Sequence, residues 1–298
     1  MNVLILGNGF IGSRLYQFLE SSSQIDRVAI LAQRDIDYTD RKIVYDYISN
    51  RMENGRIDVV VNASGYTGKP NVDACEKERD LCWKLNVEVP VMIEQTCKDL
   101  SARYIHISSG CVYDGYDKIW TEDDVPNFGL FSDKSSWYSK TKHAAETILD
   151  IDNTTVLRIR MPFTKDNTPR NYINKILEYD KLINYPNSVT CIEDLNEFIL
   201  KSIIDNIPAG IYNVVHDEPV MAKDIQLLLC EYELYNANWE FVDMSKIDIV
   251  ANRSNCMLSD RKISTLDMKL SSAFESLDYS ISLLSKQLQW KKPVTFKK

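Results

Sequence analysis

The sequence predicts an α/β fold in which a doubly wound parallel sheet is followed by a smaller C-terminal α/β part. Short apolar strands alternate with helical stretches through the first half of the chain. These strands are continuous apolar runs, which is typical of a parallel sheet covered on both faces. Beyond about residue 162 the alternation loosens and prolines punctuate short elements. With 298 residues, the chain is long enough to bury a large core.

The strands of the first half are each an apolar run. We expect them at Asn2–Leu6, Arg27–Leu31, Ile57–Ser64, Ala102–Ser109 and Thr154–Met161. A first helix is expected after the first strand, because Leu15, Phe18 and Leu19 recur at helical spacing. Further helical stretches are expected near residues 40–53, 78–98 and 135–150.

Composition excludes several classes of function. The net charge is −8 and no basic block stands out, which argues against a nucleic-acid partner. No apolar stretch approaches the roughly 20 residues that cross a bilayer, and the N-terminus lacks the pattern of a secretion signal. Seven cysteines without a C-x-x-C pair indicate free thiols and no metal site. We therefore expect a cytoplasmic protein without a membrane partner.

A glycine motif connects the first strand to the first helix. Gly7, Gly9 and Gly12 form G-x-G-x-x-G, in which the first glycine allows a tight turn, the second the approach of a pyrophosphate and the third close helix packing. The N–H groups at the helix start, at Phe10 and Ile11, favour a phosphate. Glycine turns are common, but this placement predicts a dinucleotide-binding (Rossmann) domain.

The stretch after the second strand bears on which dinucleotide is bound. An acid at this place favours the free ribose of NAD, and a basic residue favours the 2′-phosphate of NADP. Arg34 comes first here and Asp35 follows it. We expect NADPH, with NADH as the alternative, and an ordinary solvated arginine as the other interpretation of Arg34.

A hydroxyl, a thiol, a phenol and an amine are the candidate chemical groups. "SSGCVYDG" places Ser109 at the end of the fourth strand and Cys111 two residues later, while Ser108 is expected to be structural. Tyr138 and Lys142 are four residues apart and share one helix face. A cation beside a phenol lowers the pKa of the phenol, which makes Tyr138 a proton donor near neutral pH.

These residues resemble the extended short-chain dehydrogenase/reductase superfamily, whose members act on nucleotide sugars. The glycine loop, "NAS" at residues 62–64, "SSGCVYDG" and the Tyr138–Lys142 pair occur in the family's order and spacing. The resemblance implies that Asn62, Ala63 and Ser64 contact the cofactor. Nucleotide-sugar dehydratases usually carry Asp-Glu where this chain has Gly110 and Cys111, so dehydration is disfavoured.

Longer motifs resemble the bifunctional UDP-4-keto-6-deoxyglucose 3,5-epimerase/4-reductases of plant UDP-rhamnose synthesis. They cover nearly the whole chain and include "GYTGKPNVDACE", "EDDVPNF", "WYSKTK", "RIRMP", "TPRNYINKI", "PNSVT" and "ANRSN". The related GDP-fucose synthase pairs its cysteine with a histidine, whereas in the rhamnose enzymes a lysine takes that place, here Lys175. The resemblance implies that Cys111 and Lys175 form an acid–base pair and that nearby cations favour the ionised thiol. It also implies that Asn171 and Arg253 bind the UDP-sugar substrate.

Other interpretations stay open. Cys111 is alternatively a small buried side chain, Lys175 a solvated helix lysine, and Arg253 an exposed loop arginine. Two alternative functions also stay open. The chain is a 4-ketoreductase alone, or it is a non-catalytic, nucleotide-binding regulatory subunit on the same fold. We place the NADP-binding domain at residues 1–161 and a mainly substrate-binding part at 162–298, with some segments returning to the core. A homodimer is compatible with the sequence.

Overall fold

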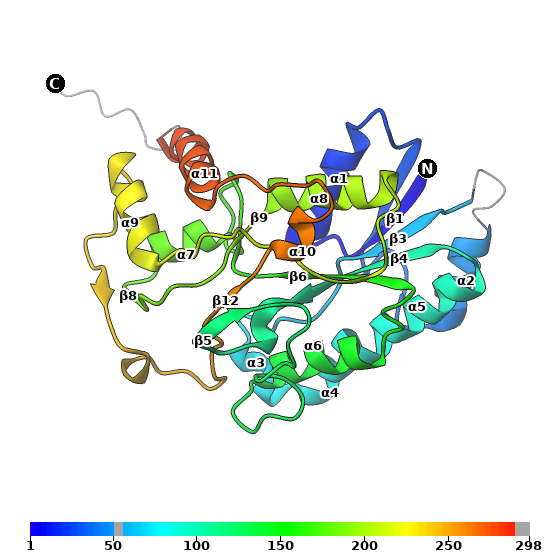
Figure 1. The fold of residues 1–298 in the computed structure, drawn as a ribbon, viewed down its shortest axis with the longest axis horizontal. Coiled ribbons are helices and arrows are strands. Elements are labelled where there is room, and N and C mark those ends of the chain that lie inside the picture. Colours follow the sequence, from blue (N-terminus) through cyan, green and yellow to red (C-terminus); the bar gives the residue numbers. More distant parts are fainter. Residues whose placement is uncertain (51–55, 290–298) are drawn as a thin grey trace.

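A six-stranded parallel sheet forms the centre of the molecule (Figure 1). The computed structural model describes residues 1–50 and 56–289. The strand order is β10-β6-β4-β3-β1-β2, and all neighbouring strands are parallel. The strands are β1 (Asn2–Leu6), β2 (Arg27–Leu31), β3 (Val59–Asn62), β4 (Arg103–Ser109), β6 (Thr154–Ile159) and β10 (Gly210–Asn213). The predicted fold class is thus confirmed.

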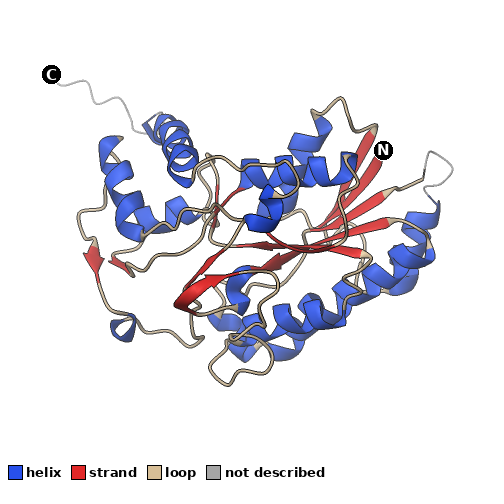
Figure 2. Cartoon of the chain, in the orientation of Figure 1, coloured by secondary structure: helices blue, strands red, loops and turns tan. Residues whose placement is uncertain are grey.

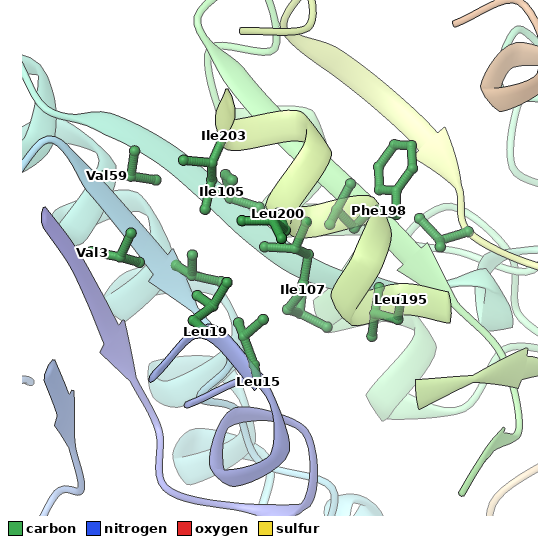
Figure 3. Packing of buried hydrophobic residues seen from close by; sticks show 14 of the residues in the cluster. Val3, Leu15, Leu19, Val59, Ile105, Ile107, Leu195, Phe198, Leu200 and Ile203 are labelled. Atoms are coloured by element: carbon green, nitrogen blue, oxygen red, sulfur yellow. The ribbon is translucent and has the colours of Figure 1, made fainter. Parts of the chain in front are cut away.

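The apolar strands bury both of their faces. Successive side chains of a strand point to opposite sides, so Val3 and Ile5 belong to one cluster while Leu4 and Leu6 belong to another. On the first face the strands pack against Leu15 and other apolar residues of two helices (Figure 3). Those helices are α1 (Phe10–Glu20) and α8 (Ile192–Ile204).

Helices from the first half cover the opposite face. They are α2 (Arg41–Asn50), α5 (Val89–Asp99) and α6 (Trp137–Ile148). The helix expected over 78–98 is divided into α4 (Arg79–Trp83), a π-helical turn (Lys84–Glu88) and α5, and is preceded by α3 (Asp73–Lys77). Residues 51–53 of the helix expected at 40–53 lie outside the described ranges.

A second apolar cluster lies at one end of the sheet, where the C-terminal helices gather (Figure 2). It is built largely from α7 (Tyr172–Glu178), α9 (Ala222–Glu231) and α11 (Ala273–Gln289). Short strand pairs flank it: β7 (Pro162–Phe163) with β9 (Thr190–Cys191), and β8 (Lys181–Leu182) with β11 (Glu240–Phe241). The remaining elements are β5 (Gly115–Trp120), β12 (Cys256–Leu258), α10 (Arg261–Ser264) and the 3-10 turns Gly110–Val112 and Met244–Lys246.

The second half of the chain is more regular than its sequence suggested. We expected short elements there, yet α8 has 13 residues and α11 has 17. α8 and β10 also join the central sheet, on its face and at its edge. The division of the chain at residue 162 stays a prediction.

A buried ion pair connects α6 to β6. Arg158 Nη2 lies 2.7 Å from Glu146 Oε2, and both side chains are 2% exposed. Ser108 Oγ donates to the same carboxylate, and Arg158 Nη1 donates to the hydroxyl of Tyr113 at 2.9 Å. The charges and their hydrogen-bonding groups are therefore satisfied without water.

All seven cysteines are free thiols. No helix within residues 1–50 and 56–289 is both long and apolar enough to traverse a lipid bilayer.

Glu146→Ala is expected to destabilise the protein strongly, because it leaves the Arg158 charge buried without its partner. The free energy of unfolding should fall by about 3–5 kcal/mol, measured by urea denaturation. Lys201→Ala is the control, since it removes an exposed ion pair with Asp205 and should cost less than about 1 kcal/mol. Equal losses in the two variants would show that burial adds nothing to the contribution of the Glu146–Arg158 pair.

Candidate active site

The order of the strands creates a crevice at the carboxyl end of the sheet. The chain proceeds from β1 outward to β2 and then returns to the other side of β1 for β3. In open α/β sheets ligands bind outside such a switch point. Two of the predicted segments meet here, the glycine loop after β1 and residues 62–64 after β3.

Two of the three loop glycines are required by the protein's own packing. Gly7 has a φ of +104°, and a Cβ on it would lie 2.6 Å from the backbone nitrogen of Ser64. A Cβ on Gly12 would lie 1.9 Å from the carbonyl oxygen of Gly7. A Cβ on Gly9, in contrast, would meet no protein atom within 4 Å. The open side of the loop at Gly9 therefore leaves room for a ligand.

The start of α1 suits a diphosphate. Gly9 occupies the N-cap position, and no side chain caps the helix there. The first-turn N–H groups, at Phe10 and Ile11, therefore face the open side without a capping partner, where the helix dipole favours an anion. The residues present fit a bound dinucleotide.

The segment after β2 presents a cation to solvent. The side chain of Arg34 is 81% exposed. Asp35 is turned toward its own backbone, where Oδ2 accepts a hydrogen bond from Ala32 N at 2.7 Å. Arg34 Nε lies 3.7 Å from the other oxygen of Asp35, Oδ1, so the guanidinium is exposed but pairs with the neighbouring carboxylate.

Asn62 shapes the loop after β3 from inside the protein. Its side chain is fully buried, accepts hydrogen bonds from Ser64 N at 3.0 Å and Ser64 Oγ at 2.5 Å, and donates to Tyr104 at 2.9 Å. Ala63 is held by a backbone hydrogen bond to Leu6 O at 2.9 Å. The Asn62 amide is therefore occupied within the protein, and the cofactor contact expected at residues 62–64 stays a prediction.

The structure brings Ser109, Tyr138 and Lys142 together at the ends of β4 and α6. Ser136 caps α6 by accepting from Ser139 N at 3.1 Å, which places Tyr138 in the first turn. The side chains of Tyr138 and Ser109 are hydrogen-bonded. Lys142, one turn further, is buried and donates from Nζ to Ile107 O at 3.0 Å.

Burial has the largest effect on the pKa values in this group. Burial and the nearby thiol of Cys111 raise the pKa of Tyr138, while the hydrogen bond from Ser109 opposes this rise. Burial also lowers the pKa of Lys142 to about 8. The lowering of the phenol pKa that was expected from Lys142 stays a prediction for the site with its cofactor bound.

Cys111 contacts a cation that was not expected from the sequence. Its Sγ is partly exposed, and Arg160 Nη1 lies 3.6 Å from it. The Cys111 N–H donates to Ser109 Oγ at 3.2 Å, so the thiol and the hydroxyl are adjacent. The available signal for Arg160 was a second arginine in the otherwise apolar run at residues 154–161.

Lys175 lies among other cations. It is half-buried on α7, and burial together with Arg170 and Arg253 lowers its pKa. Arg253 Nη1 pairs with Asp73 Oδ1 at 2.8 Å. Arg170, which was also not expected from the sequence, donates to Thr67 Oγ1 at 2.9 Å. This cluster of cations suits a diphosphate, whereas the cation that contacts Cys111 is Arg160.

Asn171 is hydrogen-bonded within the protein at the start of α7. It is fully buried and caps α7 by accepting from Ile173 N at 3.2 Å. Its Nδ2 donates to Thr164 O at 2.7 Å and Asp166 O at 2.9 Å. These bonds occupy both ends of its amide, and the substrate contact expected for Asn171 stays a prediction.

Comparison with known proteins places the chain among nucleotide-sugar enzymes. A bifunctional dTDP-4-dehydrorhamnose 3,5-epimerase/dTDP-4-dehydrorhamnose reductase of Arabidopsis thaliana is 33% identical over 258 residues, which is 79% of this chain and 83% of that protein. A trifunctional UDP-glucose 4,6-dehydratase/UDP-4-keto-6-deoxy-D-glucose 3,5-epimerase/UDP-4-keto-L-rhamnose-reductase of the same plant is 32% identical over 257 residues. The match covers 79% of this chain but only 37% of the trifunctional protein's length.

Structural comparison agrees with this placement. A crystal structure of a UDP-rhamnose synthase from Acanthamoeba polyphaga mimivirus superposes with a TM-score of 0.84 at 25% identity, over 95% of this chain and 99% of that one. The family model described as the RmlD substrate binding domain matches residues 1–195. With that match over more than half of its length, and with motifs that resemble the extended short-chain reductases, the chain belongs to the RmlD substrate binding domain family.

Proposed function

We propose that this chain binds NADPH and converts UDP-4-keto-6-deoxy-D-glucose to UDP-L-rhamnose, by 3,5-epimerisation followed by reduction of the C4 ketone. The observation that carries the proposal is the meeting of Ser109, Cys111 and Tyr138 at the carboxyl end of β4, in the sheet whose first strand leads into the glycine loop. The bifunctional Arabidopsis relative, 83% of whose length aligns with this chain, supports both activities in a protein of this size.

The reduction uses the hydroxyl groups as proton donors. Ser109 and Tyr138 hydrogen-bond the C4 oxygen and stabilise the negative charge that develops on it. Bound NADPH would supply the hydride to C4, and Tyr138 gives its proton to the oxygen. Lys142, with a pKa of about 8, is mostly protonated at neutral pH and favours loss of the phenol proton through its charge.

The epimerisation uses the same oxygen-binding arrangement. Loss of a proton from C3 or C5 gives an enolate whose charge rests on the C4 oxygen, next to Ser109 and Tyr138. Inversion requires a base on one face of the sugar and an acid on the other, and Cys111 and Lys175 take these roles in either order. The lowered pKa of Lys175 increases its neutral fraction near neutral pH, which suits a proton carrier.

The two parts of the chain bind different ligands in this proposal. Residues 1–161 bind the cofactor, with Arg34 on the 2′-phosphate. Residues 162–298 mainly bind the substrate, with the UDP diphosphate near Arg170 and Arg253. The two guanidinium groups are planar forks that match phosphate oxygens.

A second candidate is reduction alone, with the epimerisation carried out by another protein. The position of Lys175 favours it, because Arg170 and Arg253 are the charges that act on this lysine. Incubation with UDP-4-keto-6-deoxyglucose and NADPH, followed by identification of the sugar, separates the two candidates. UDP-rhamnose supports the bifunctional enzyme, and an unepimerised 6-deoxy sugar supports the reductase.

Tyr138→Phe is expected to reduce NADPH consumption by about 10³-fold, because only the phenol proton is removed. NADPH binding, followed by fluorescence titration, should stay within about twofold. The control is Tyr45→Phe, which changes an exposed tyrosine of α2 and should leave turnover unaltered. Normal turnover in Tyr138→Phe would remove this residue from the mechanism.

Arg34→Ala is expected to weaken NADPH binding by about 10- to 100-fold, the loss of one charge-assisted contact. NADH binding should change little, since NADH carries no 2′-phosphate. Arg41→Ala, an exposed arginine paired with Asp99, is the matched control. Equal losses for the two cofactors would disprove the assignment of Arg34.

Cys111→Ser is expected to abolish rhamnose formation in either order of the roles, because a serine hydroxyl is too weak an acid to replace the thiol. If Cys111 is the base, the variant also stops exchange of the C3 and C5 protons with deuterated solvent. Reduction of the unepimerised ketone should continue slowly, since Ser109, Tyr138 and Lys142 are unchanged. Lys175→Ala should also abolish rhamnose formation, with exchange at one carbon retained. NMR of the recovered sugar measures both effects. Rhamnose formation at the normal rate in Cys111→Ser would exclude the thiol from catalysis.

A further inference from the structure

Two buried arginines lie on β6 and immediately after it, and only one has a carboxylate partner. Arg158 is paired with Glu146, whereas Arg160, 1% exposed, forms no ion pair with any Asp or Glu in the described part of the chain. Removing a guanidinium from water costs several kcal/mol unless an opposite charge compensates it. Arg160 is therefore buried without a carboxylate that would compensate the free-energy cost of removing its charge from water.

The partners of Arg160 are formally neutral groups. Nη1 donates to Ser254 Oγ at 3.0 Å and lies 3.6 Å from Cys111 Sγ. Nη2 donates to Ser254 O at 2.7 Å and to Asn187 Oδ1. Nε is buried without a hydrogen-bond partner. The compensating charge must then come from a titratable neighbour or from a ligand.

Four titratable groups interact with Arg160 electrostatically: Cys111, Cys256, Tyr116 and Tyr172. Burial raises the pKa of Tyr116 and of Tyr172 to about 12, and it also raises the pKa of Cys256. These three groups are therefore neutral near pH 7. Cys111 remains, and its sulfur is partly exposed and in contact with Nη1.

We propose that Arg160 is the counter-ion of the Cys111 thiolate and so allows this thiol to carry protons. The proposal rests on the proposed epimerisation. The thiol first loses its proton to solvent. The thiolate then takes a proton from the sugar carbon, the electron pair of that C–H bond forms the enolate, and the S–H bond is restored. If Cys111 acts as the acid, the thiolate is the product of its step, and Arg160 neutralises it equally.

Other groups that face Cys111 do not replace Arg160 in this role. Tyr138 and Lys142 face it from α6, and Cys256 from β12. Lys142 is also a cation that interacts with Cys111 electrostatically, but its hydrogen bond goes to Ile107 O, whereas Arg160 Nη1 contacts the sulfur itself. Tyr138 and Cys256 carry no positive charge. Arg160 is thus a positioning residue, which acts on the sugar only through the sulfur of Cys111.

Alkylation by iodoacetamide tests the proposal without any enzyme assay. The thiolate sulfur displaces iodide and forms a thioether, which peptide mass spectrometry assigns to each cysteine. Cys230 is an exposed thiol and serves as the internal reference. In Arg160→Met the rate at Cys111 relative to Cys230 should fall by about tenfold or more at neutral pH, and Arg160→Lys should restore most of it. An unchanged rate ratio in Arg160→Met would overturn the proposal.

The unaltered protein gives a second measurement that does not require the variant to fold. Between about pH 9 and about pH 6 the rate ratio of Cys111 to Cys230 should rise, because the positive charge of Arg160 beside the Cys111 sulfur favours its anionic form. A ratio that stays constant with pH would refute the counter-ion role. Ser254→Ala keeps the charge of Arg160, so the rate ratio should still rise in this variant as the pH falls. A constant rate ratio in Ser254→Ala would also count against the proposal.

The two proposals fail separately. A rising ratio in an unaltered protein that forms no rhamnose from UDP-4-keto-6-deoxyglucose and NADPH overturns the epimerase function but leaves the counter-ion role intact. A constant ratio together with loss of proton exchange in Cys111→Ser overturns the counter-ion role and leaves the epimerase function intact.

Discussion

The ion pair between Glu146 and Arg158 fixes α6 to the sheet. Glu146 lies four residues after Lys142 and eight after Tyr138, so all three side chains share the helix face that meets the sheet. The pair joins this face to β6, and the hydrogen bond from Ser108 joins it to β4. β4 ends at Ser109. The ion pair near the C-terminus of α6 therefore fixes the position of Tyr138, near its N-terminus, relative to the Ser109 hydroxyl.

Arg158 and Arg160 are both buried, but their charges have different partners and different roles. The charge of Arg158 is neutralised within the fold, so it contributes rigidity and leaves no field for a ligand. The charge of Arg160 is surrounded by hydroxyl, amide and carbonyl oxygens and by a thiol. Such groups orient a guanidinium but do not cancel it. A positive field therefore remains at the place where the proposed reaction generates negative charge.

Local patterns in the sequence identified the parts of the structure that depend on local chemistry. The bounds of β1 and β2 were predicted correctly because each is an apolar run with turn residues after it. The Tyr138–Lys142 pair followed from helical spacing. Arg160 could not be assigned, since its contacts with Cys111 and Ser254 join residues 49 and 94 positions apart. The internal hydrogen bonds of Asn62 and Asn171 were not foreseen, because a motif does not reveal burial.

α8 and β10 are synthesised after the rest of the central sheet, because they come late in the sequence. Leu195, Phe198 and Ile203 of α8 cover the same sheet face as Ile105 and Ile107 (Figure 3), and β10 completes the edge beside β6. When the first 161 residues have emerged, α1 covers part of this face, but the part that α8 covers and the edge beside β6 are both exposed. The nascent chain therefore exposes apolar surface and an unpaired strand until about residue 213 is out. During that interval chaperones that bind exposed apolar segments are expected to bind the growing chain.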